Sequence, residues 1–230
     1  MQIRFCNFKP SLYFFQEIVR GGTPSLCRQG LASVATIFLN RAAGFHGDAA
    51  IAGMSIVSRV SMFANSALIG FGQGFQPVCG FNYGAGKNDR VLEAFWFCVR
   101  YAFVFLLFVG TAGFIFAPEL VTLFRKNDLK VIEVGTAALR YQVIAFPLNA
   151  WIVMCNMMLQ SVGKGLKASI VASARQGLCF IPLIMILSHF LGLFGVEICQ
   201  AVSDVLTLVI SVPIGMSVIR EMQRMNPKKC

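Results

Sequence analysis

Asp204 is the residue of this chain whose type and position most directly suggest chemistry. It is a carboxylate placed well inside a long apolar stretch, and four arginines lie one to three helical turns inside other such stretches: Arg59, Arg100, Arg140 and Arg175. Charged side chains in a membrane segment are costly, usually pair with one another, and mark functional sites. The sequence therefore makes Asp204 and Arg175 candidates for charge pairing or for ion coupling.

Uncharged polar side chains recur at helical spacing in five of the apolar stretches. In 24–44, for example, Gln29, Ser33, Thr36 and Asn40 follow one another at intervals of four, three and four, which is one face of a helix. Interhelical hydrogen bonding explains any one such residue, whereas five aligned stripes favour a hydrated cavity inside a bundle. We therefore predict that Asp204 and a set of amides point into the bundle interior, and the amides are our candidates for lining a substrate cavity: Gln29, Asn65, Gln142, Asn149, Asn156 and Gln176.

A glycine-rich run occupies residues 70–87, GFGQGFQPVCGFNYGAGK. It is not a Walker A loop, because Phe81 stands where that motif needs glycine and Asn88 stands where it needs serine or threonine. Its remaining regularity is the spacing of Gly70 with Gly74 and of Gly80 with Gly84, which is typical of helices that pack closely in membranes. We expect these glycines to lie at helix contacts.

The composition indicates a membrane protein. Hydrophobic residues make up 57% of the 230 residues and charged residues 13%, against about 25% charged in soluble domains. The net charge of +10 is spread between apolar runs rather than gathered in one patch, so we expect no nucleic-acid partner. The eight cysteines form no CxxC pair, the two histidines (His46 and His189) are isolated, and no nucleophile motif occurs. We therefore expect neither an enzyme nor a protein with a metal or cofactor.

Six apolar segments are each long enough to cross a bilayer, which takes about 20 residues. We expect an all-α membrane protein whose six transmembrane helices form one lobe over 24–222: 24–44, 49–80, 91–118, 131–161, 166–191 and 194–219. Residues 1–23 are predicted to be a cytoplasmic linker with an interfacial helix, and 223–230 a basic cytoplasmic tail. Lysine and arginine in alternate connections (Lys87, Arg90, Lys164 and Lys167) predict that both termini face the cytoplasm. A third, opposite connection also carries basic residues (Arg125, Lys126 and Lys130), balanced in part by nearby acids.

Several short motifs occur in order along the chain. They are Pro24-Ser25 through Arg28-Gln29-Gly30, Gly47-Asp48-Ala49-Ala50-Ile51-Ala52, Gly72-Gln73-Gly74-Phe75-Gln76-Pro77 with Gly80-Phe81-Asn82-Tyr83-Gly84-Ala85, and Arg175-Gln176-Gly177 before Pro182. In these motifs the chain resembles multidrug and toxic compound extrusion (MATE) transporters, in particular the MepA-like branch. The resemblance covers about residues 10–222 and only the second lobe of such a transporter.

The resemblance implies a function and partners. MATE proteins have two six-helix lobes and export lipophilic cationic compounds in exchange for protons or sodium ions across the bacterial cytoplasmic membrane. The sodium-coupled NorM branch carries acidic ligands in the first and fourth helices of this half, but the matching stretches here, near Ala32-Ser33 and Asn149–Trp151, contain none. The resemblance therefore implies the C-terminal half of an antiporter, truncated or split, with a complementary N-terminal lobe as partner and no evident ion site of its own.

Two alternatives stay open from the sequence. A six-helix subunit could pair with a second copy of itself to make a complete transporter. A passive pore or a scaffold subunit belongs to a different class, although the chain shows neither a ring of like residues nor a filter motif.

Overall fold

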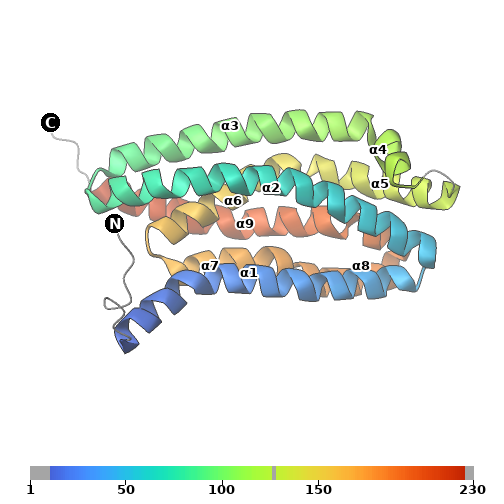
Figure 1. Ribbon diagram of the computed structural model, residues 1–230, viewed down its shortest axis with the longest axis horizontal. Helices are drawn as coiled ribbons and strands as arrows, with labels where there is room; N and C mark the ends of the chain where they lie inside the picture. The colour runs from blue at the N-terminus through green and yellow to red at the C-terminus, as the bar shows by residue number, and fades with distance from the viewer. Residues whose placement is uncertain (1–10, 126–127, 226–230) are drawn as a thin grey trace, which may run out of the picture.

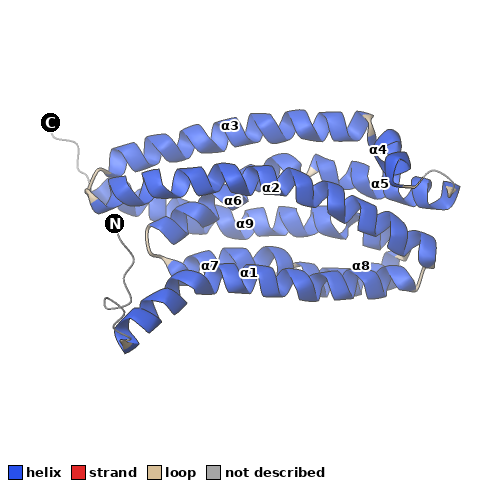
Figure 2. Cartoon of the chain, viewed as in Figure 1, coloured by secondary structure: helices blue, strands red, loops and turns tan. Residues whose placement is uncertain are grey.

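The computed structural model describes residues 11–125 and 128–225, and over these residues the chain is helical with no strand (Figures 1 and 2). The elements are α1 (Leu12–Gly44), α2 (Asp48–Gly84), α3 (Asn88–Ile115), α4 (Ala117–Phe124), α5 (Leu129–Ile144), α6 (Phe146–Ser161), α7 (Gly165–Ser173), η2 (Ala174–Leu178), α8 (Phe180–Leu191) and α9 (Leu193–Met225). The long helices lie side by side, and the chain reverses at the two ends of an elongated bundle (Figure 1).

One predicted segment is sharply bent, and one predicted breaker contains a helix. Segment 131–161 is divided into α5 and α6, which meet at Ala145 with a bend of 53°. Pro147 lies in the first turn of α6, where its missing N–H needs no helical partner; it therefore begins a new helix. The stretch predicted as a breaker between Pro118 and Asp128 contains a further short helix, α4, because Pro118 again occupies a first turn.

Four helical stretches are long and apolar enough to cross a membrane, namely α2, α3, the run Gly165–Leu191 and α9, and the bent pair α5–α6 would be a fifth. The described residues thus form an all-α membrane protein. α1 does not reach the same hydropathy, since its polar side chains lower its average, so its role as a sixth span stays a prediction. α1 also runs without interruption from Leu12 to Gly44, so no helix end separates the predicted linker from the first predicted span. Residues 1–10 and 226–230 lie outside the described residues.

α6 is the central helix of the bundle. Every residue from Ile152 to Leu159 is buried, as expected of a helix that other helices surround. The largest fully buried side chains around it include Phe95, Leu68 and Leu106 from α2 and α3. Within the described chain, α6 therefore has no exposed face between Ile152 and Leu159.

A close approach of α2 and α5 uses glycines other than those the sequence suggested. A Cβ added to Gly53 of α2 would lie 3.1 Å from the backbone nitrogen of Gly135 in α5, so the two backbones touch there. By contrast, a Cβ on Gly70, Gly74, Gly80 or Gly84 would meet nothing within 4 Å. The expectation for those four glycines is wrong within the described residues, because that side of α2 faces outward.

The bundle has one basic end. The α2–α3 and α6–α7 connections lie at the same end as the last turns of α9, at the left in Figure 1. Two contacts join them: the Asn88 side-chain amide donates to the Met222 carbonyl at 3.4 Å, and Lys164 pairs with Glu221. Six basic residues of the described chain belong to these segments, which we call the basic end: Lys87, Arg90, Lys164, Lys167, Arg220 and Arg224.

Candidate functional site

A buried ion pair joins η2 to α9. The Arg175 Nε lies 2.9 Å from Asp204 Oδ1, with the Asp204 side chain 0% exposed and that of Arg175 14% exposed. The other arginines that we considered as partners, Arg59, Arg100 and Arg140, are exposed. Arg140 instead lies over the ring of Phe114 at 5.4 Å. The structure thus brings together the two charged residues that the sequence singled out.

Amides complete the shell around Asp204. The side-chain amide of Asn149 in α6 donates to Oδ2 at 3.2 Å, and that of Gln200 in α9 donates to Oδ1 at 3.3 Å. With Arg175, the carboxylate therefore accepts three hydrogen bonds from three elements. A buried charge is stable only when such partners compensate for its lost hydration. Asp204 consequently ties α6, η2 and α9 together at the centre of the bundle.

The irregular helix at η2 positions Arg175. The Cys179 N–H donates to the Ala174 carbonyl at 2.9 Å, an i to i+5 pattern that widens the helix by one residue. Pro182 lies in the first turn of the next regular helix, α8, and has no N–H to give to the Leu178 carbonyl four residues before it. The carbonyl of Arg175 accepts a hydrogen bond from the Ser203 hydroxyl of α9 at 3.0 Å. Side chain and backbone of Arg175 are therefore both held by α9.

A second polar network connects α2, α6 and α7. The Gln76 amide donates to Gln160 at 3.4 Å, the Gln160 amide donates to Asn156 Oδ1 at 2.5 Å, and the Asn156 amide donates to the Ala168 carbonyl at 2.7 Å. Each of these amides thus has a protein partner. The network supports the interhelical hydrogen-bonding explanation for Asn156.

The predicted inward-facing residues fall into three groups. Gln142, Asn149, Asn156 and Asp204 are buried, as expected. Asn65 and Gln176 are half-buried, and the Asn65 amide donates to the Ser61 carbonyl of its own helix. Gln29 is exposed, so its predicted inward orientation is wrong. The reason is that α1 buries its small residues, such as Ala35, Ala42 and Ala43, and turns its polar stripe outward.

A small cavity lies beside two of these amides. A cavity of about 40 Å³ is lined by Asn156, Arg175 and Gln176 with neighbouring apolar side chains. Bound drugs need about 300–1,000 Å³, whereas this volume suits one or two waters. This cavity is therefore too small for a drug, and the expected wide hydrated cavity inside the lobe stays a prediction.

Sequence reasoning missed two features. Glu197 is a second buried carboxylate of α9, 8% exposed, and it stands seven residues before Asp204 on the same helix face. That spacing was visible in the sequence, but Glu197 looked like a helix-end residue. His46 and His189, which looked isolated, line one groove of about 550 Å³ between α1 and α8. Among the described residues, no three side chains of the metal-binding types gather at one point.

The polar stripe of α1 forms an exposed face, which we call the α1 polar face: Gln29, Ser33, Thr36 and Asn40. The hydroxyls of Ser33 and Thr36 donate to carbonyls of the same helix at 3.2 and 2.8 Å, so they need no outside partner. No such bond satisfies Gln29 or Asn40 within the described residues. An unpaired amide facing hydrocarbon costs several kcal/mol, which indicates that this face meets water or protein.

Comparison with known proteins shows which family shares this arrangement. The MatE family model matches residues 24–186, most of the chain. The chain belongs to the MatE family. The multidrug export protein MepA of Staphylococcus aureus (strain NCTC 8325 / PS 47) is 28% identical over 190 residues, and MepA of Staphylococcus haemolyticus (strain JCSC1435) is 28% identical over 188 residues. Each of these matches covers 82% of this chain and 41% of the relative.

Solved structures of MATE transporters agree with the fold. A multidrug resistance MATE family transporter of the MOP superfamily, in its outward-facing conformation, superposes with a TM-score of 0.88 and 25% identity. A MOP superfamily transporter from Pyrococcus furiosus Vc1 (DSM3638) gives 0.87 and 25%. Both matches cover 96% of this chain but 50% of the solved one. The MatE chain described here thus has the fold of a half-length lobe, and it spans half or less of the proteins it matches.

Proposed function

We propose that this chain is the C-terminal half of a multidrug efflux antiporter that exports lipophilic cationic compounds in exchange for protons or sodium ions. One observation carries the proposal: 96% of the chain matches 50% of a solved MATE transporter. The names of its relatives add the substrate class, since MepA is a multidrug export protein. Alternating access needs two halves moving around a shared site, so the function belongs to an assembly of two lobes.

The α1 polar face supports the placement of the substrate site between the lobes. The interior cavity of about 40 Å³ is too small for a drug, while Gln29 and Asn40 are polar, exposed and without a side-chain partner in the described chain. A second lobe that covers this face would enclose these amides in a shared, hydrated space. Gln29 then contacts substrate from α1, while Asn149 and Asn156 hold the lobe together from within.

Coupling to an ion needs a carboxylate whose proton or bound ion is exchanged during transport. The Asp204 carboxylate forms an ion pair with Arg175 and accepts hydrogen bonds from two amides. These contacts favour a structural role for Asp204. In this proposal the exchanging carboxylate comes from the other lobe, a complementary six-helix unit or a second copy of this chain. The basic end faces the cytoplasm of the bacterial cell, because lysine and arginine are retained on that side of the membrane.

Cysteine labelling tests this orientation. We start from a variant in which Cys6, Cys27 and Cys230, whose side chains lie outside the described ones, are replaced by serine. The remaining cysteines are buried and are expected to give little background: Cys79, Cys98, Cys155, Cys179 and Cys199. We expect Lys87→Cys and Leu166→Cys at the basic end to resist a membrane-impermeant maleimide in intact cells, and Phe45→Cys and Leu129→Cys to react. All four side chains are exposed in the folded lobe, so burial does not decide the result. Labelling of the first pair alone would reverse the orientation.

Efflux from proteoliposomes tests the function. We expect this chain alone to give no gradient-dependent ethidium efflux, and efflux to appear when it is co-reconstituted with the first lobe of a MepA-like relative. Full-length Staphylococcus aureus MepA serves as the positive control. Efflux from this chain alone would replace the half-transporter proposal by the homodimer, and leakage independent of any gradient would indicate a pore.

A further inference from the structure

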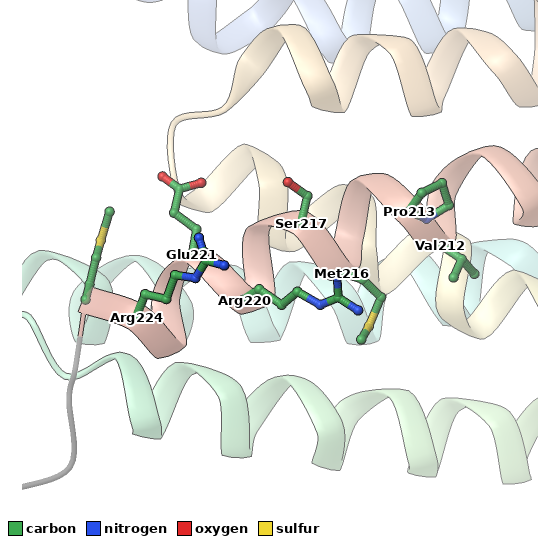
Figure 3. A pocket seen from close by; sticks show the side chains of 8 residues that line it. Val212, Pro213, Met216, Ser217, Arg220, Glu221 and Arg224 are labelled. Atoms are coloured by element: carbon green, nitrogen blue, oxygen red, sulfur yellow. The ribbon is translucent and has the colours of Figure 1, made fainter.

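The last turns of α9 carry a groove on their outer side. Its volume is about 860 Å³, and it is lined by Val212, Pro213, Met216, Ser217, Arg220, Glu221, Arg224 and Met225 (Figure 3). Along the helix its lining changes from mostly apolar residues to charged ones, two basic and one acidic. This lining belongs to neither the Asp204 network nor the α1 polar face.

The groove continues a stripe that runs along α9. Leu206, Val209, Pro213, Met216, Arg220 and Arg224 follow at intervals of three, four, three, four and four, so they share one helix face. Leu206 is 41% exposed and Val209 64% exposed, which makes the beginning of the stripe an uncovered apolar surface. From Val209 to Arg220 the helix rises about 16 Å, which is about half of the ~30 Å hydrocarbon layer. This part of the stripe therefore has about the length of one leaflet.

The two arginines at the end of the stripe have free positive charge. Neither Arg220 nor Arg224 forms an ion pair within residues 11–125 and 128–225, whereas the acidic residue between them, Glu221, pairs with Lys164. In Figure 3 the Glu221 carboxylate points toward the α6–α7 connection, and Arg220 and Met216 extend on the other side of α9. Lys164 thus neutralises the carboxylate that would otherwise compete for the guanidinium groups.

We propose that this groove binds an anionic phospholipid, with its phosphate on Arg220 and Arg224 and an acyl chain along Val209, Pro213 and Met216. Guanidinium groups bind phosphate through paired hydrogen bonds, and basic pockets at the cytoplasmic side of membrane helices bind anionic head groups. This surface differs in polarity from the face that we assign to the lobe interface. The α9 stripe is apolar up to its arginines, whereas the α1 polar face carries amides and hydroxyls. The inference rests on α9 crossing the membrane and not on drug export.

Lipid titration of the purified, delipidated chain in detergent tests the proposal. Bound lipids are counted by native mass spectrometry with phosphatidylglycerol, with phosphatidylcholine, and with glycerol 3-phosphate as a head group without acyl chains. We expect phosphatidylglycerol to bind at least tenfold more tightly than phosphatidylcholine, and glycerol 3-phosphate to show no binding at the same concentrations. The double variant Arg220→Gln/Arg224→Gln removes the preference. Lys87→Gln/Arg90→Gln, with the same charge change at the same end, keeps it.

Each other outcome overturns the proposal. Equal losses in the two double variants would mean diffuse attraction to the basic end, and tight binding of glycerol 3-phosphate would mean a site for soluble phosphate compounds. If the chain forms dimers that the Arg220→Gln/Arg224→Gln variant loses, with lipid binding unchanged, the groove is an interface with a second copy. The single variants Arg224→Gln and Lys87→Gln give the same comparison if a double variant is poorly folded.

Discussion

Replacing Asp204 by alanine is expected to lower the free energy of unfolding of the lobe by about 3–5 kcal/mol, the cost of leaving a buried charge without its partner. The change removes the acceptor of the 2.9 Å contact from Arg175 and of the hydrogen bonds from Asn149 and Gln200. Thermal unfolding of the purified chain in detergent is the measurement. An expected second sign is faster proteolysis around η2, because α9 then holds Arg175 only through its backbone.

Two further variants show whether the charge itself causes the loss. Asp204→Leu combined with Arg175→Met removes both charges, and apolar replacement of a whole buried pair is often nearly neutral, so most of the stability is expected to return. The Arg125 side chain is 57% exposed and that of its partner Asp128 is 36% exposed. Arg125→Ala breaks this exposed pair and is expected to lower the free energy of unfolding by at most about 1 kcal/mol. If Asp204→Ala costs no more than Arg125→Ala, the ion pair does not hold the helices together.

Replacing Gly53 by leucine is expected to destabilise the lobe by about 3 kcal/mol, the upper end of the usual cost of overpacking. Any Cβ at this position lies 3.1 Å from the Gly135 backbone nitrogen, and a backbone cannot move aside as a flexible side chain can. α2 and α5 must then separate along their most extensive contact. Thermal unfolding in detergent measures the effect.

Gly70→Leu in the same helix is the matched control. A Cβ at Gly70 meets nothing within 4 Å, and leucine favours helix over glycine by up to about 1 kcal/mol, so a small gain in stability is expected. Similar losses at both positions would mean that helix propensity or the detergent, rather than the contact between α2 and α5, determines the result. With the complementary lobe present, the Gly70 side of α2 could also become a contact, and the control is therefore measured on this chain alone.

Much of the architecture followed from the sequence. Long apolar runs separated by glycine, proline and charged residues have few arrangements other than membrane helices, and this is why the helical stretches lie where hydropathy placed them. The pairing of Asp204 with an arginine was also predictable, since a charge inside an apolar segment needs a partner. The bend between α5 and α6 was harder to predict from the sequence, because a proline in the middle of an apolar segment is compatible with either a kink or a new helix start.

The direction of each polar face was decided by the tertiary structure. Helical periodicity shows that Gln29, Ser33, Thr36 and Asn40 share a face of α1, but only packing shows that this face is exposed while that of Asn149 and Asp204 is buried. The same holds for glycines: spacing favoured Gly70 and Gly74, whereas the contact lies between Gly53 and Gly135, 82 positions apart. Periodicity is a property of one helix, while burial depends on which neighbours cover it, and those neighbours come from distant parts of the chain.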